Sequence, residues 1–387
     1  PTACACSGSA SVSDRPAPPT PLVIVSNHAE IVGGGEESLL GLLGALDRAR
    51  WTPAVVVPAE GAVAARARAL GGAVHVIPLP SLRRPGPALA RSVGALRRLV
   101  TATAAALVHA NGSRAMAYGG VAARLAHRPV IWHVRIGERD PLLDRALGWL
   151  ADRVIVISHA VARRFPRALA RKVRVVPNGA DLERFAPRPP SARLRAALGI
   201  PDGTPAVVSV GRFVALKGYG HLLDAAAALD AERPGVHWIL VGDGELRADL
   251  EARARSLGLA ARVHFTGWRD DIPDLMALGD LLVLPSLAEP FGRVLIEAMA
   301  MARAVVATSA GGVPEIVVHG ETGLLVPPAD PRALAAAVRE LLDDPARAAR
   351  LGAAGRRRAQ AEFGLARHAA AVGALYDELL SEGHGGL

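Results

Sequence analysis

Apolar and polar positions follow two patterns that take turns along the chain. Short runs of β-branched and other apolar residues are typical of strands, and the stretches between them, rich in Ala, Leu and Arg, have helical length. Near-continuous apolar runs fit strands buried on both faces, and strands that alternate with helices form parallel sheets. In the first part of the chain, we expect strands over 22–26, 54–57, 73–77, 107–110, 130–134, 154–157 and 173–176.

A proline-rich segment interrupts this alternation. Pro187, Pro189 and Pro190 lie close together, which is typical of a linker between domains. The sequence therefore predicts an α/β protein with two Rossmann-like domains, over 21–188 and 189–364, that face each other across a ligand-binding cleft. An amphipathic pattern also predicts a last helix over about 365–382. Strands of the second domain are expected over 206–210, 237–241, 263–265, 281–284, 304–307 and 323–326.

Composition adds the setting in which the protein works. The 387 residues are 51% apolar and 21% charged, an ordinary balance for a globular chain. No apolar run reaches the roughly 18 residues that a membrane span needs. The first 20 residues are mostly Ala, Ser, Thr and Pro, so we expect a disordered tail over 1–20 rather than a signal peptide. The two cysteines, Cys4 and Cys6, are too few for a disulfide framework, and we expect a cytoplasmic protein.

The net charge of +9 is unevenly distributed. Residues 1–190 hold 25 Lys and Arg against 12 Asp and Glu, whereas the remainder holds 20 against 24. Basic surfaces suit anionic lipid, and arginines alternate with apolar residues over Leu82–Val100. We expect peripheral contact with the inner face of an anionic membrane, but solvated helix faces explain the pattern equally well. The arginines concerned are Arg83, Arg84, Arg91, Arg97 and Arg98, and a second basic stretch spans 163–174.

Nucleic acid is a poor candidate for the partner of this basic half. The chain has 14 aromatic residues and no motif for stacking on bases, and its second half is mildly acidic.

Three glycines follow the first expected strand. Gly33, Gly34 and Gly35 precede an expected helix over Ser38–Arg50, so backbone N–H groups and the positive end of the helix dipole would face a ligand. We expect Gly34 and Gly35 to approach a phosphate group. A loop that is merely flexible is the alternative.

Two cations follow the first strand of the second domain. Arg212 comes directly after that strand, and Lys217, one of only two lysines, lies near the next helix. Arginine grips phosphate oxygens in a bidentate manner, and lysine adds a mobile charge. The pair can neutralise a leaving diphosphate, although two solvated surface cations would read the same in the sequence.

Two carboxylates flank a turn later in the second domain. Glu289 and Glu297 are separated by seven residues that include Phe291 and Gly292. A carboxylate that faces a cleft can accept hydrogen bonds from two sugar hydroxyls, so Glu297 suits a ribose and Glu289 a hexose. A solvated helix glutamate is the alternative for Glu297.

These motifs recur with others in a fixed order. They are, in chain order, Val210-Gly211-Arg212 with Lys217-Gly218, Leu240-Val241-Gly242-Asp243-Gly244, Phe265-Thr266-Gly267, the Glu289–Glu297 segment, Gly311-Gly312-Val313-Pro314-Glu315 and Gly320–Val326. The ordered set resembles the retaining family-4 glycosyltransferases of the GT-B fold. Gly33–Glu36 and Val176–Asp181 of the first domain are also similar to that family, so the resemblance covers most of the chain.

The resemblance implies a role for each site residue. Arg212 and Lys217 would stabilise the leaving diphosphate, Glu297 would hold the ribose, and Glu289 would contact the donor sugar. The last helix would return to the first domain. Further donor contacts would come from Gly34, Gly35, Gly267, Arg269, Phe291 and Gly292. We expect Trp268, beside Gly267, to be a core residue rather than a base-stacking one.

In the first domain, the resemblance draws attention to histidines at strand ends. His133 would touch the donor sugar, as a histidine at such a place does in the family, although Val134-Arg135 follows where an acidic residue is common. His109 ends another strand and is expected to face the same rim, and Arg135 is a candidate for an anionic acceptor.

The implied reaction transfers a hexose-type sugar from a UDP-, GDP- or ADP-sugar to a lipid-linked, polysaccharide or small-molecule acceptor, with retention of the anomeric configuration. Neither metal nor cofactor is expected, because the first domain has no Asp-x-Asp and the cations of the second would take the place of a metal. A sugar-nucleotide epimerase of the same fold is the alternative, and a basic lipid- or nucleic-acid-binding protein is a weaker one.

Overall fold

The computed structural model describes residues 18–82 and 86–384. Most of the expected N-terminal tail, with Cys4 and Cys6, lies outside these residues, and so do Arg83 and Arg84 of the basic stretch. The first strand begins at Thr20, inside the range that we assigned to the tail.

The first domain contains a sheet of seven parallel strands in the order β3-β2-β1-β4-β5-β6-β7. Neighbouring strands of this sheet pair in parallel, and helices connect strands that follow one another in the chain, as the alternation of apolar runs with helical stretches predicted. Strand β2 begins three residues earlier than expected, because Pro53 is tolerated near the start of a strand. The strands are β1 (Thr20–Ser26), β2 (Trp51–Val57), β3 (Ala73–Val76), β4 (Leu107–Asn111), β5 (Val130–Val134), β6 (Arg153–Val156) and β7 (Val173–Val175).

The second domain repeats this plan with six parallel strands in the order β10-β9-β8-β11-β12-β13. Every residue of β9 and β12 is buried, as expected for strands covered on both faces. The two sheets confirm the predicted α/β fold with two Rossmann-like domains. The strands are β8 (Ala206–Val210), β9 (His237–Val241), β10 (Val263–Gly267), β11 (Leu281–Leu284), β12 (Ala304–Thr308) and β13 (Leu324–Val326).

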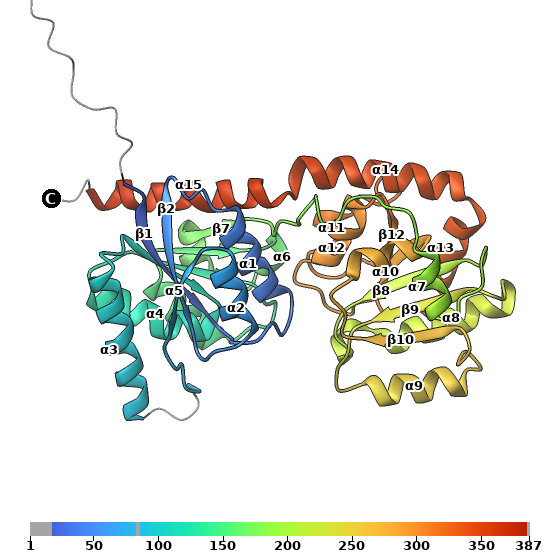
Figure 1. The fold of residues 1–387 in the computed structure, drawn as a ribbon, viewed down its shortest axis with the longest axis horizontal. Coiled ribbons are helices and arrows are strands. Elements are labelled where there is room, and N and C mark those ends of the chain that lie inside the picture. Colours follow the sequence, from blue (N-terminus) through green and yellow to red (C-terminus); the bar gives the residue numbers. More distant parts are fainter. Residues whose placement is uncertain (1–17, 83–85, 385–387) are drawn as a thin grey trace, which may run out of the picture.

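Helices cover both faces of each sheet (Figure 1). The first domain has α1 (Gly34–Ala45), α2 (Ala62–Ala69), α3 (Pro87–Ala102), α4 (Ser113–Leu125), α5 (Pro141–Leu150), α6 (His159–Ala162) and the 3-10 helix η1 (Arg167–Lys172). The second part of the chain has α7 (Ala192–Ala197), η2 (Ala215–Lys217), α8 (Tyr219–Glu232), α9 (Arg247–Ser256), α10 (Ile272–Leu278), α11 (Arg293–Ala300), α12 (Val313–Ile316), α13 (Pro331–Asp343), α14 (Pro345–Glu362) and α15 (Leu365–His384).

The last helix returns to the first domain. In Figure 1, α14 runs along the second domain and α15 continues along the first. Apolar residues of α15, among them Val372 and Leu379, pack with Leu22, Leu107 and Ile131 of the first sheet. Within the described residues, none of the helices is long and apolar enough to cross a membrane.

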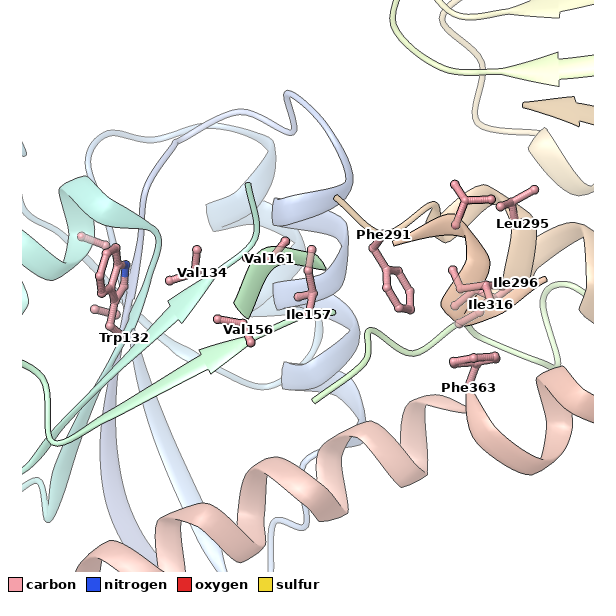
Figure 2. Close-up of a cluster of buried hydrophobic side chains, with 14 of the residues drawn as sticks. Trp132, Val134, Val156, Ile157, Val161, Phe291, Leu295, Ile296, Ile316 and Phe363 are labelled. Carbon is pink, nitrogen blue, oxygen red and sulfur yellow. The ribbon is translucent and has the colours of Figure 1, made fainter. Parts of the chain in front are cut away.

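An apolar contact joins the two domains. Phe291 of the second domain is buried and belongs to the same cluster as Ile157 and Val161 of the first. Its ring also meets Phe363, with 6.1 Å between the ring centroids (Figure 2). The contact places the loop after β11 against the end of β6, so loops at the carboxyl ends of both sheets face each other.

Candidate active site

The triple-glycine turn lies between arginines of the two domains. Helix α1 begins at Gly34, four residues earlier than expected, so both glycines belong to its first turn. A Cβ atom added to Gly34 would lie 3.8 Å from Arg293 Nε of the second domain, and one added to Gly35 would lie 3.8 Å from Arg135 Cδ. The helix N-terminus and two guanidinium groups therefore lie close together, a combination that favours an anion, and Glu36 and Glu37 of the same helical turn partly offset their charge.

The predicted cations of the second domain differ in their surroundings. Arg212 is exposed directly after β8, and within the described residues no hydrogen bond or ion pair engages its guanidinium group. Lys217 Nζ lies 2.5 Å from Glu289 Oε2, and Ser286 Oγ donates to the same carboxylate oxygen at 3.0 Å. Two residues that we assigned to different parts of the donor thus neutralise each other.

Close backbone packing brings these two loops together. Gly218 has a φ of 68°, and a Cβ atom there would meet the Pro285 carbonyl oxygen at 2.1 Å. Strands β8 and β11 are neighbours in the sheet although they are distant in sequence, and ligands of such sheets bind beside the loops that follow strands of this kind. Arg212, Lys217 and Glu289 all lie on the segments that follow these two strands.

Glu297 points into the protein from α11. The residue is 5% exposed, and its Oε1 atom has no hydrogen-bond partner in the described structure. Arg293, one turn earlier, places Nη2 at 3.1 Å from that oxygen as an ion pair. Burial raises the pKa of Glu297, and Arg293 partly offsets the effect. A buried carboxylate that has an ion-pair partner but no hydrogen bond at this oxygen is suited to hydroxyl donors such as those of a ribose.

The turn before α11 is fixed by contacts on two sides. Ser158, the N-cap of α6 in the first domain, donates from Oγ to the Pro290 carbonyl oxygen at 2.6 Å. On the other side, the Gly312 N–H group donates to the Glu289 carbonyl oxygen at 2.9 Å. Gly292 caps α11 with a φ of 102°, a conformation that favours glycine.

A carboxylate of the second domain caps a helix of the first. Glu315 accepts hydrogen bonds from the backbone N–H groups of His159 and Ala160, both at 2.8 Å. The negative charge faces the N-terminus of α6, where it is favourable. Together, Ser158 and Glu315 form an interdomain clasp around the turn that carries Glu289.

The segment from Gly267 to Arg269, which we expected to contact the donor, has a mixed outcome. Gly267 ends β10 with a φ of 73°, and its carbonyl oxygen accepts from the Gly242 N–H group at 3.0 Å. Arg269 forms two hydrogen bonds to Asp271, at 2.7 and 2.5 Å. Trp268 is 57% exposed, so the expectation of a core tryptophan is wrong. Trp268 comes directly after β10, at the carboxyl edge of the sheet, and its side chain faces solvent instead of the apolar core.

The expectation that His109 faces the rim is also wrong. In β4, side chains alternate between the two faces of the sheet, and His109 shares the face of Leu107, which α15 covers. The ring is fully buried, and its Nδ1 atom lies 2.7 Å from the Tyr376 hydroxyl group of that helix.

His133 and Arg135 lie next to each other at the end of β5. His133 is buried, with Nδ1 at 3.2 Å from His109 Nε2 and with no partner for its own Nε2. Arg135 donates to the side-chain oxygens of Asn111 and Asn178, both at 2.6 Å. Burial lowers the pKa of Arg135 to about 9. Contact of His133 with a sugar stays a prediction.

Comparison with known proteins agrees with this geometry. Residues 32–184 match the family model "Glycosyltransferase Family 4", and residues 191–358 match "Glycosyl transferases group 1". The chain is 32% identical over 300 residues to a 2-deoxystreptamine glucosyltransferase of Streptomyces kanamyceticus, an alignment that covers 71% of this chain and 77% of the relative. The chain belongs to the family-4 glycosyltransferases of the GT-B fold.

Two further relatives of this glycosyltransferase show how far the likeness extends. An α-D-kanosaminyltransferase of Streptomyces kanamyceticus is 41% identical over 156 residues, which is 40% of each chain, so the matched part spans less than two thirds of that relative. A crystal structure of Anabaena Alr3699/HepE in complex with UDP and glucose is 28% identical, with a TM-score of 0.80, and covers 92% of this chain and 99% of that one. Another structure of the Anabaena protein is a complex with UDP-glucose. These relatives do not support the epimerase alternative.

Sequence reasoning missed three residues of this site. The contacts of Ser158 and Glu315 form only when the two domains are placed together, whereas Arg293 pairs with Glu297 within one helix. A signal existed for Arg293, since it precedes Glu297 by four residues on one helix face. Ser158 also follows a strand and begins a helix, which is the position of an N-cap.

Proposed function

We propose that this glycosyltransferase moves a hexose-type sugar from a nucleotide-sugar donor to an acceptor with retention of the anomeric configuration. One observation carries the proposal: free Arg212, the Lys217–Glu289 pair and the buried Glu297 carboxylate lie on the second domain, and the N-terminus of α1 lies beside Arg293, the ion-pair partner of Glu297. The binding of UDP and UDP-glucose by the Anabaena relative supports a nucleotide-sugar donor.

The proposed roles follow from the charges. Arg212 and Lys217 bind the diphosphate, and the N-terminus of α1 approaches it from the first domain. Lys217 exchanges its contact with Glu289 for the phosphate, which frees the carboxylate to accept sugar hydroxyls. Glu297 accepts the ribose hydroxyls at its buried carboxylate, beside Arg293. As the bond to the anomeric carbon breaks, these preorganised cations stabilise the charge that develops on the departing phosphate.

Thermal stabilisation by nucleotides tests the donor site. Purified protein is melted with UDP, GDP, ADP and their sugars, with EDTA or with Mg²⁺. A ligand at a hundred times its Kd adds about 2.7 kcal/mol of stability. We expect one nucleotide to stabilise equally well in EDTA, which agrees with donor binding that needs no metal, and Arg212→Ala with Lys217→Ala to abolish the effect. An exposed-arginine control, Arg255→Ala on α9, keeps it. A protein that no nucleotide stabilises would refute the proposal.

We also propose that the first domain meets an anionic membrane at the cytoplasmic face. In α3, Arg91, Arg97 and Arg98 are exposed, whereas Val93 and Leu96 pack into the core. The helix therefore offers charge rather than an apolar face to lipid. In the second basic stretch, Arg164 is buried in an ion pair with Asp144 and has a structural role.

Flotation with vesicles tests this contact. Binding to vesicles that contain phosphatidylglycerol is expected at low salt and should weaken as salt screens the charges. Replacing Arg91, Arg97 and Arg98 by Gln should abolish it. Protein that stays unbound at low salt, or a triple variant that binds as well as the parent, would refute the membrane proposal.

A further inference from the structure

A buried chain of polar side chains leads from the last helix to the candidate site. The Tyr376 hydroxyl group of α15 lies 2.7 Å from His109 Nδ1, and His109 Nε2 lies 3.2 Å from His133 Nδ1. Arg135 Nη2 reaches the same Nδ1 atom of His133 at 3.4 Å. All three rings of the chain, Tyr376, His109 and His133, are inaccessible to solvent.

Arg135 determines the direction of every hydrogen bond in this chain. A guanidinium group can only donate, so His133 Nδ1 must be an acceptor without a proton. His109 Nε2 must then carry the proton that it shares with His133. His109 Nδ1 is left as an acceptor, and the Tyr376 hydroxyl group donates to it. The reverse direction would place a proton of His133 against the guanidinium group.

Both imidazoles are neutral in this setting. Burial lowers the pKa of His109 to about 3, and burial together with the charge of Arg135 also lowers the pKa of His133 well below its usual value. A neutral imidazole carries a single N–H group, so a proton excluded from Nδ1 of His133 must reside on Nε2.

We propose that Tyr376 and His109 are positioning residues that hold His133 as the tautomer protonated on Nε2, with that N–H group kept for a hydroxyl of the substrate. The Nε2 atom of His133 is buried and has no partner in the described structure. An unpaired buried donor is costly, and its cost is offset when a ligand hydroxyl accepts from it. The tautomer of His133 is inferred from the hydrogen bonds alone, and only its role in sugar transfer rests on the proposed function.

A neighbouring histidine has the opposite tautomer. His368 Nδ1 lies 2.7 Å from the Pro177 carbonyl oxygen, which can only accept, so the proton of His368 resides on Nδ1. Its ring centroid is 5.9 Å from that of His133. The two histidines therefore give a built-in internal comparison for any measurement of tautomers.

Nitrogen-15 NMR of histidine-labelled protein tests the tautomers without any substrate. Long-range correlations separate protonated from bare ring nitrogens, and single His→Gln variants assign the signals. We expect protonated Nε2 in His109 and His133, and protonated Nδ1 in His368. Protonated Nδ1 in His133 of the parent protein would overturn the proposal, and this measurement needs no variant of Tyr376 to fold.

Tyr376→Phe removes the donor and keeps the ring that packs edge-on against Trp51 at 5.2 Å. Its control is Tyr118→Phe, because the buried Tyr118 donates to the Pro80 carbonyl oxygen in the same domain, away from the histidines. We expect Tyr376→Phe to shift the signals of His109 Nδ1 and of His133, and Tyr118→Phe to leave them in place. Identical histidine signals in the two variants would show that Tyr376 does not act on His133 through His109, and would thereby overturn this proposed link, the relay.

Kinetics separates this proposal from the proposed function. For Tyr376→Phe, we expect kcat to fall about threefold to tenfold, as for the loss of one hydrogen bond, with the donor KM within about twofold of the parent. A parent protein with the expected tautomers but with no transfer activity would refute the proposed function and leave the relay standing. Equal losses of kcat in Tyr376→Phe and Tyr118→Phe would refute the relay.

Discussion

Glu297→Gln should stabilise the free protein while it weakens donor binding. The carboxylate is buried, its Oε1 atom lacks a hydrogen bond, and its main charge partner, Arg293, has a side chain that is 25% exposed. Burial raises the pKa of Glu297 above its value in the unfolded chain. In the free protein, burial therefore makes the ionised form of Glu297 unfavourable, and a ligand that donates hydrogen bonds to the carboxylate would relieve this cost.

The size of the effect follows from two opposing terms. A buried acceptor without a hydrogen bond costs about 1–3 kcal/mol and more when it is charged, and an amide of the same shape keeps an acceptor oxygen but removes the charge. The ion pair with Arg293 is partly exposed, so its loss costs about 0.5–1 kcal/mol. The expected net gain in the free energy of unfolding is about 0–2.5 kcal/mol at neutral pH. For a domain of this size, each kcal/mol raises the Tm by roughly 2–4 °C.

The upward direction of the pKa shift of Glu297 also determines how the stability depends on pH. Because the folded-state pKa of Glu297 is raised, its contribution to stability is fully present below the unfolded pKa and is lost as the pH rises through the folded value. The Tm advantage of Glu297→Gln should therefore be small near pH 4, where both proteins carry a neutral side chain, and should grow toward pH 7. Thermal melts at several pH values, with and without the nucleotide, measure it.

Glu362→Gln is the matched control. Glu362 also pairs with an arginine four residues earlier on its helix, at 3.0 Å from Arg358, but its side chain is 44% exposed. We expect a Tm change close to zero and unchanged nucleotide binding. The reasoning about Glu297 fails if Glu297→Gln lowers the Tm of the free protein at pH 7, or if the variant binds nucleotide as tightly as the parent.

Three further substitutions, the first with a matched control, test the frame around the site. Gly311→Ala places a Cβ atom 2.0 Å from a carbonyl oxygen at a φ of 56°, so chemical denaturation should show a loss of stability of about 2–5 kcal/mol. Its control, Gly320→Ala, has a φ of 77° and open space around the Cβ atom, and should lose only about 1–2 kcal/mol. Equal losses would contradict the steric argument. Asp144→Ala leaves the buried Arg164 without its ion-pair partner and should cost about 3–5 kcal/mol by the same measurement, so a loss below about 1 kcal/mol would contradict this. Ser158→Ala removes one interdomain hydrogen bond, and we expect slower transfer with unchanged nucleotide-induced stabilisation; an unchanged rate would show that the clasp does not position the site.

Local patterns were enough to predict the thirteen strands and the order of the motifs. Each of the thirteen expected apolar runs became a strand of the two sheets, because the alternation of apolar and polar residues follows from which faces a strand or helix buries. Glycine turns and charged residues after those strands placed Arg212, Lys217, Glu289 and Glu297 at the carboxyl edge of the second sheet, since parallel strands end at one edge.

Pairings between distant residues were decided only by the tertiary structure. Lys217 and Glu289 are 72 residues apart, and His109 and Tyr376 are 267 apart, so no local periodicity predicts that they touch. The same holds for the contact of Ser158 with Pro290 across the two domains. Periodicity tells which face of an element is buried, but the covering element, α15 over His109 and solvent over Trp268, depends on how the whole chain packs. The sequence by itself determined which residues could carry the chemistry, and the packing of distant segments determined which of them are free to do so.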